Sequence, residues 1–124
     1  MPTIGAVDTP TVWHNPRCSK SRGALALLAE RGIEPDLVRY LDDAPDRAAL
    51  EDVLRKLGTD DPRAIMRTGE ARYRELGLDD ADRDALLDAL VAEPALIERP
   101  IVVVGDRALV ARPPERLLEL LDEG

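Results

Sequence analysis

The order of hydrophobic and polar residues predicts a strand–helix–strand unit near the start of the chain. Residues 11–14 have the composition of a short strand, and residues 36–41 alternate between apolar and polar side chains, as a half-buried strand does. Between them, leucines at helical spacing predict a helix over 18–31 that Gly32 ends. Its buried face is expected to carry Leu25, Leu28 and Ala29. Because two strands joined by a helix usually lie parallel, we expect a parallel pair.

A helical block is predicted for the middle of the chain. In residues 46–58, apolar side chains recur at i, i+1, i+4, i+5 and i+8, which is the spacing of an amphipathic helix. Asp46 is placed to cap this helix and Gly58 to end it. Three further helices are expected, near 62–66, near 70–76 and over 82–92.

The last part of the chain predicts a β-hairpin and a final helix. Two apolar segments, 101–104 and 107–111, flank a turn, and "PPERLLELL" begins a helix with proline in its first turn. The whole order predicts an α/β fold in which helices flank a mixed four-stranded sheet. A helical insertion at about 46–92 is expected between the second and third strands, within one domain over residues 1–124.

Composition narrows the classes of function. The 124-residue chain has a net charge of −8, so no nucleic-acid partner is expected. Aromatic residues make up 2% of the chain, which is too few to form a surface on which the bases of single-stranded nucleic acid stack. No apolar run approaches the roughly 18 residues that cross a bilayer, so no membrane partner is expected, and the first ten residues lack signal-peptide features. One cysteine cannot form an internal disulfide, and we expect a reducing, cytoplasmic location.

The only cysteine, Cys18, lies at the expected start of the first helix, within "HNPRCSKSR". A free thiol has a pKa of about 8.5, and the unpaired N–H groups and positive dipole end of a helix N-terminus favour its anion. Arg22, one turn further on, is expected on the same face as the thiol. His14 is either a donor near the thiol or a plain turn residue, and Arg17 and Lys20 are expected at the surface. A turn followed by a cysteine at a helix start is how a thioredoxin-like fold presents an exposed, reactive thiol.

Several chemistries are excluded around Cys18. One histidine and one cysteine do not make a zinc site, so no metal is expected, and no glycine motif for nucleotides occurs. Ala24 breaks the C-x5-R pattern of tyrosine phosphatases, and Ser21 stands where a C-x-x-C motif has its second cysteine. A lone cysteine is often a small buried hydrophobic residue, but the polar flanks here favour a reactive thiol. A redox-active Cys18 then needs a second thiol from outside the chain.

Four segments together resemble a known family, the glutaredoxin-coupled arsenate reductases, which have a thioredoxin fold with a helical insertion. The segments are "HNPRCSKSR", "AIMRTGEARYRELGL", "LIERPIVV" and "ALVARPPE", and the resemblance extends from about Thr11 to Leu121. It implies that Cys18 is the nucleophile and forms a covalent adduct with arsenate. Glutathione, a co-substrate and not a bound cofactor, then displaces the adduct, and glutaredoxin completes the reduction to arsenite.

The resemblance also implies the residues of an oxyanion site. Three arginines match those that hold the oxyanion in the family: Arg67, Arg99 and Arg112. Guanidinium groups suit this role because they bind tetrahedral oxyanions in bidentate fashion. Four further residues match substrate-binding positions beside the nucleophile: His14, Ser21, Arg22 and Pro100. The histidine is implied to help lower the thiol pKa, and the proline to form a cis bond that directs the Arg99 backbone towards Cys18.

Two alternatives stay open. One is a monothiol reductase that uses glutathione on another substrate, which would need Cys18 and Pro100 but not all three arginines. The other is a relative without enzymatic activity that regulates transcription by binding RNA polymerase, although its redox-sensing members resemble a C-x-x-C switch that Ser21 removes. The sequence also leaves open the physiological thiol donor, the exclusion of phosphate and the oligomeric state.

Overall fold

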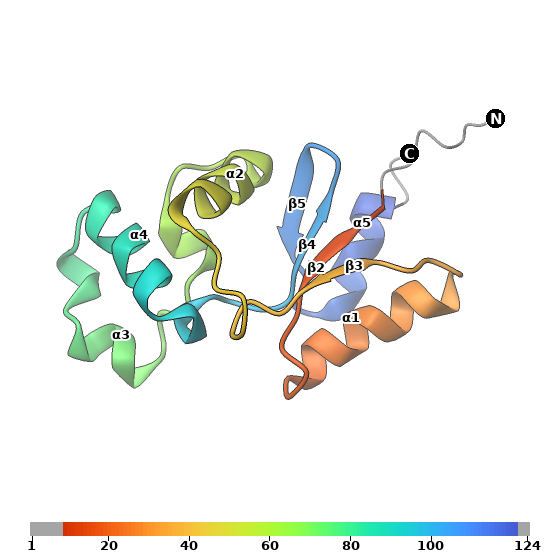
Figure 1. Cartoon of the computed structure of the whole chain (residues 1–124), viewed down its shortest axis with the longest axis horizontal. Helices are drawn as coiled ribbons and strands as arrows, with labels where there is room; N and C mark the ends of the chain where they lie inside the picture. The colour runs from red at the N-terminus through yellow and green to blue at the C-terminus, as the bar shows by residue number, and fades with distance from the viewer. Residues whose placement is uncertain (1–8, 122–124) are drawn as a thin grey trace. The chain divides into compact units, whose positions relative to one another are not determined.

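The chain divides into two compact units of different architecture. The computed structural model describes residues 9–121. Met1–Arg39 with Arg99–Gly124 forms the first unit, and Tyr40–Glu98 forms the second (Figure 1). The helical insertion expected at about 46–92 lies within the second unit. The ends of the expected 1–124 domain, and most of the segment tested for signal-peptide features, fall on residues 1–8 and 122–124, outside the described residues.

The first unit contains a mixed four-stranded sheet. Its strands are β2 (Thr11–Trp13), β3 (Asp36–Val38), β4 (Ile101–Val104) and β5 (Arg107–Val110), in the spatial order β3-β2-β4-β5. β2 pairs in parallel with β3, whereas β4 is antiparallel to both β2 and β5. The α/β class, the parallel first pair and the hairpin are therefore confirmed.

Helices of the first unit pack around this sheet and against each other. α1 (Ser19–Glu30) follows β2, and the 3-10 turn η4 (Pro114–Leu117) leads into α5 (Leu118–Leu121) (Figure 1). The turn η4 contacts α1, and Gly23 permits this close approach because a Cβ at that position would lie 3.1 Å from Cγ of Pro114. The final helix with proline in its first turn is confirmed, although it begins as a 3-10 turn.

Two sequence expectations about the first unit are wrong in detail. The buried face of α1 carries Ser21, Ala24 and Leu28, whereas Leu25 is half-buried and Ala29 is exposed. The buried face of the helix is therefore rotated relative to the face that its leucines predicted. The residues at i, i+3 and i+7, counted from Ser21, face the interior. The second strand is also shorter than 36–41 and mostly exposed, because β3 is an edge strand.

The corrected helix face predicts unequal costs for two leucine truncations. Leu28 is fully buried, so Leu28→Ala should lower the free energy of unfolding by about 3 kcal/mol through lost burial and a cavity. Leu25→Ala is the matched control, and because Leu25 is only half-buried it should cost less than about 1.5 kcal/mol. Urea unfolding of both variants measures the difference. Equal costs would contradict this orientation of α1.

The second unit is helical. It contains α2 (Arg47–Leu57), α3 (Ala71–Glu75) and α4 (Arg83–Ala92), with 3-10 turns at Pro62–Ile65, Leu78–Asp80 and Pro94–Leu96. Asp46 caps α2 by accepting a hydrogen bond from the N–H of Ala49 at 2.9 Å, and Gly58 ends it with a φ of 83°, as predicted. The turns at Leu78–Asp80 and Pro94–Leu96 were not expected. No helix within residues 9–121 has the length and apolar character needed to cross a bilayer.

Candidate active site around Cys18

One edge of the sheet in the first unit brings together residues that are distant in sequence. Trp13 pairs with Val38 on one side and with Ile101 on the other, and Ile101 pairs with Val110. The residues just beyond these pairs therefore meet at one edge. Two hydrogen bonds continue the pairing there, from the N–H of His14 to the Val38 carbonyl at 2.8 Å and from the N–H of Ala111 to the Pro100 carbonyl at 2.9 Å. Across the strands, the edge carries Arg39, His14, Arg99 with Pro100, and Arg112.

A tight turn leads from this edge to Cys18. The N–H of Cys18 donates to the Asn15 carbonyl at 2.9 Å, and the Asn15 side chain accepts from the N–H of Arg17 at 3.0 Å. The N–H of Asn15 in turn donates to Oγ of Ser21 at 3.3 Å. Cys18 has extended backbone angles at the N-cap of α1, as an N-cap residue does. The asparagine and the buried serine thus hold the turn that places the thiol at the helix start.

The sulfur of Cys18 is more buried than expected, with only 8% of the residue exposed. Burial by itself raises the pKa of the thiol, but hydrogen bonds from the backbone N–H groups of Ser21 and Lys20, and then the hydrogen bond and charge of Arg99, outweigh it. Together they lower the pKa of Cys18 to about 7. The expectation of an exposed thiol is therefore wrong, and the thiolate is stabilised inside a shell of N–H donors.

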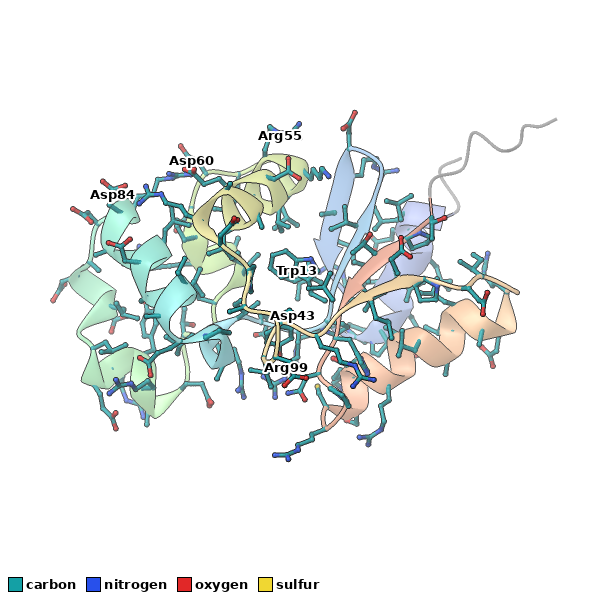
Figure 2. The ribbon with its side chains drawn as sticks, viewed as in Figure 1. Trp13, Asp43, Arg55, Asp60, Asp84 and Arg99 are labelled. Carbon is teal, nitrogen blue, oxygen red and sulfur yellow. The ribbon has the colours of Figure 1, made fainter. Side chains whose placement is uncertain are left out.

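The positive charge beside the Cys18 sulfur belongs to Arg99, whereas the sequence predicted Arg22 in this place. The Arg99 side chain reaches the sulfur from the segment before β4, and Figure 2 shows it beside the loop that leads into α1. The Arg22 guanidinium instead donates to the Pro16 carbonyl at 3.0 Å and is not among the main causes of the lowered pKa of Cys18. Helical spacing correctly placed Arg22 one turn from Cys18, but its long side chain turns back to the loop carbonyl. Strand register, which spacing does not reveal, brings Arg99 to the thiol.

The dipeptides Arg99–Pro100 and Arg112–Pro113 lie at the same edge of the sheet. The Arg99–Pro100 bond is cis, which confirms the expectation for Pro100. The Arg112–Pro113 bond is also cis, which was not expected. A guanidinium nitrogen of Arg112 donates to the Arg99 carbonyl at 2.9 Å, so Arg112 supports the backbone of the residue that contacts the sulfur.

His14 and Ser21 both lie buried beside the turn. Burial first, and then the charges of Arg39 and Arg22, lower the pKa of His14, which favours the neutral imidazole. This shift works against the imidazole as a source of positive charge for the thiol. Ser21 acts through its backbone N–H on the sulfur and through its hydroxyl on the turn. Arg17 and Lys20 are exposed, as expected, although the backbone N–H of Lys20 reaches the sulfur.

Arg67 lies in the second unit. Its N–H donates to the Leu96 carbonyl at 2.8 Å, and its guanidinium pairs with Glu70 at 2.9 Å. Leu96 is followed within the same segment by Glu98, whose N–H donates to the Ile65 carbonyl at 2.7 Å, and Glu98 precedes Arg99 in the chain. The backbone around Arg67 is thus tied to the segment that continues into the first unit. Its part in an oxyanion site stays a prediction from the resemblance.

The expected contribution of the helix N-terminus is confirmed, since the backbone N–H groups of Lys20 and Ser21 act on the sulfur. Sequence reasoning missed Arg39, which lies at the same sheet edge directly after β3. The described residues include no group of three or more His, Cys, Asp or Glu side chains that could hold a metal ion.

Comparisons with known proteins agree on one family. The sequence model of the ArsC family matches residues 13–120. An arsenate reductase of Neisseria meningitidis serogroup A is 51% identical over 89% of this chain and 96% of the relative. An uncharacterized protein of Escherichia coli is 48% identical over 89% of this chain and 94% of that protein. The solved structure of an arsenate reductase from Vibrio cholerae superposes with a TM-score of 0.87 at 45% identity, covering 90% of this chain and 97% of that one.

Proposed function

Because the chain belongs to the ArsC family, we propose that it is an oxidoreductase that reduces arsenate to arsenite through Cys18. The observation that carries the proposal is a thiol with a pKa of about 7, held by backbone N–H donors and the Arg99 side chain. About half of such a thiol is ionised at neutral pH, whereas an ordinary cysteine is only a few per cent thiolate. The thiolate is the nucleophilic form, so this site is prepared for attack on an electrophilic centre.

The first step of the proposed reaction forms a sulfur–arsenic bond. The Cys18 thiolate attacks arsenic, and one arsenate oxygen leaves as water after taking up a proton from solvent. Arsenic stays pentavalent, and the product is an anionic thioester of arsenate on Cys18. Arg99 suits this step because its guanidinium already contacts the sulfur and can bind the oxyanion that the sulfur attacks.

The second step needs a thiol from outside, because the chain has one cysteine. An external thiolate attacks the sulfur of Cys18 and forms a mixed disulfide. The electron pair of the broken sulfur–arsenic bond stays on arsenic, which leaves as trivalent arsenite. A further thiol then regenerates the Cys18 thiolate. Glutathione and glutaredoxin are the reductants proposed from the resemblance, and the reducing cytoplasm is the proposed location.

Arg112 and Arg67 have supporting roles in the proposal. Arg112 donates to the Arg99 carbonyl at 2.9 Å and is exposed, and it is proposed from the resemblance as the second arginine of the oxyanion site. Arg67 is included as the third arginine of the oxyanion site from the resemblance alone, and in this structure its guanidinium pairs with Glu70 at 2.9 Å.

A coupled assay tests this function directly. NADPH oxidation is followed in the presence of glutathione, glutaredoxin and glutathione reductase, with arsenate, with phosphate in its place, or with neither. We expect arsenate-dependent oxidation and none above background with phosphate. Turnover of a small organic disulfide without turnover of arsenate would instead favour a glutathione-dependent reductase of another substrate.

A further inference from the structure

Four cations near Cys18 lack an acidic partner among the described residues, although the chain is strongly acidic. In the second unit, most basic side chains pair with carboxylates, as Arg72 does with Glu93 at 2.7 Å, whereas Arg74 donates to the Gly69 carbonyl. In the first unit, no ion pair within residues 9–121 involves the three cations that flank Cys18 in sequence, Arg17, Lys20 and Arg22, or Arg39 at the end of β3. The chain has a net charge of −8, so its carboxylates outnumber its basic side chains. Cations left without them are suited to an anionic ligand.

Arg39 and Arg22 approach one buried residue, His14, from different elements. Arg39 follows β3, and the carbonyl of its neighbour Val38 accepts the N–H of His14 at 2.8 Å. Arg22 lies in the first turn of α1, where its guanidinium bonds the Pro16 carbonyl at 3.0 Å. Both charges act on the imidazole of His14 and lower its pKa. The hydrogen bond to Val38 sets Arg39 beside the end of β2, and the hydrogen bond to Pro16 holds the Arg22 guanidinium at the loop that follows His14.

His14 adds a buried hydrogen-bonding atom without a partner. The residue is 5% exposed, and its Nδ1 has no hydrogen-bond partner among the described residues. Buried nitrogen atoms of this kind are normally paired, so this one indicates a partner that the described residues do not supply.

Arg39 and the oxyanion arginines lie on different sides of β2 at this end of the sheet. Along the sheet edge, Arg39 stands at the end of β3 and His14 at the end of β2, whereas Arg99 precedes β4 and Arg112 follows β5. The carboxyl ends of parallel strands next to a helix N-terminus are where α/β folds bind ligands. At this edge, Arg39 is therefore a positive group next to β3, whereas Arg99 and Arg112 are positive groups next to β4 and β5.

We propose that Arg39 and Arg22, together with His14, form a carboxylate subsite for a small anionic thiol that attacks the sulfur of Cys18. The inference rests on the proposed function, because that reaction requires an external thiol to reach the same sulfur. Glutathione carries a carboxylate at each end of the molecule, so one end can bind these arginines while its sulfur meets Cys18. A neutral thiol gains nothing from the subsite, and a cationic one is repelled.

The experiment forms the mixed disulfide without arsenate. The Cys18 thiolate attacks one sulfur of a symmetrical disulfide, the sulfur–sulfur bond breaks, and the other half leaves as a thiolate. Three probes differ in charge: glutathione disulfide is negative, bis(2-hydroxyethyl) disulfide is neutral and cystamine is positive. Intact-mass spectrometry measures the second-order rate constant for each. Dividing by the rate constant for the neutral probe cancels any change in the reactivity of Cys18 itself.

We expect Arg39→Gln to lower the glutathione-to-neutral rate ratio by about three- to tenfold and to raise the ratio for cystamine. Arg22→Gln should act in the same direction, and Arg39→Glu should act more strongly. The matched control is Arg17→Gln, which removes an exposed charge next to Cys18 that is not among the main charges acting on His14. Ratios unchanged in Arg39→Gln, or lowered equally in Arg17→Gln, would overturn the subsite. Because arsenate is absent, either result leaves the test of arsenate reduction independent.

Discussion

Cys18→Ser is expected to reduce arsenate-dependent NADPH oxidation at least about a thousandfold, to the rate without enzyme. A serine hydroxyl is not ionised near pH 7, and the hydrogen bonds that hold the thiolate do not bring it into that range. Serine also cannot form the mixed disulfide through which an external thiol would release arsenite. The loss should therefore appear in kcat, with every reductant and at every arsenate concentration.

The fold itself should tolerate this substitution. Cys18 occupies an N-cap position, where serine is among the most favoured residues. Thermal unfolding of Cys18→Ser should thus stay close to that of the wild type, so that lost activity reports chemistry and not unfolding. Arsenate turnover that survived in a folded Cys18→Ser protein would rule out the sulfur as nucleophile.

Arg99→Ala is expected to impair both the thiolate and the oxyanion site. Removing the guanidinium takes away a hydrogen bond and a positive charge from the sulfur, so the pKa of Cys18 should rise from about 7 towards that of a free thiol. Less thiolate would then be present at neutral pH. Because the same group is proposed to bind arsenate, kcat/KM for arsenate should fall by about a hundredfold or more.

The pH dependence of alkylation separates these two effects. The rate of reaction of Cys18 with iodoacetamide follows the thiolate fraction, so in the wild type it should rise with pH around a midpoint of about 7. In Arg99→Ala the midpoint should move to higher pH, while the plateau rate at high pH is retained.

Arg99→Lys is the matched control that separates the planar geometry of the guanidinium from its charge. It keeps the charge but loses the planar fork that binds an oxyanion in bidentate fashion, so the alkylation midpoint should shift less than kcat/KM falls. An alkylation midpoint near 8.5 in the wild type, the ordinary value for a free thiol, would contradict the stabilised thiolate. Unchanged kcat/KM in Arg99→Lys would show that bidentate geometry does not matter at this position.

Local patterns in the sequence were sufficient for most elements. The cap at Asp46, the stop at Gly58 and the hairpin between 101 and 111 depend on residues close in the chain, and the structure confirms each of them. The position of Cys18 at the start of α1 is confirmed for the same reason. The short turns at Leu78–Asp80 and Pro94–Leu96 were missed because single 3-10 turns have too few residues to show a period.

Other features depended on how the elements pack. Which face of α1 is buried was misjudged because leucine spacing alone does not show that Ser21 and Ala24 face the interior. The burial of Cys18 was misjudged for a similar reason, since its polar neighbours in sequence indicated exposure, whereas the segment before β4 reaches the sulfur.

The sequence by itself determined the order of strands and helices and the position of a single thiol at a helix start. It also implied that a redox-active Cys18 would need a second thiol from outside the chain. Only the tertiary structure decided which cation meets the Cys18 thiol. Arg22 is four residues from Cys18, yet its guanidinium bonds the Pro16 carbonyl, whereas the register of β2 against β4 brings Arg99 to the sulfur. The physical reason is that helix spacing is set by local backbone geometry, while contacts between remote segments are set by strand pairing.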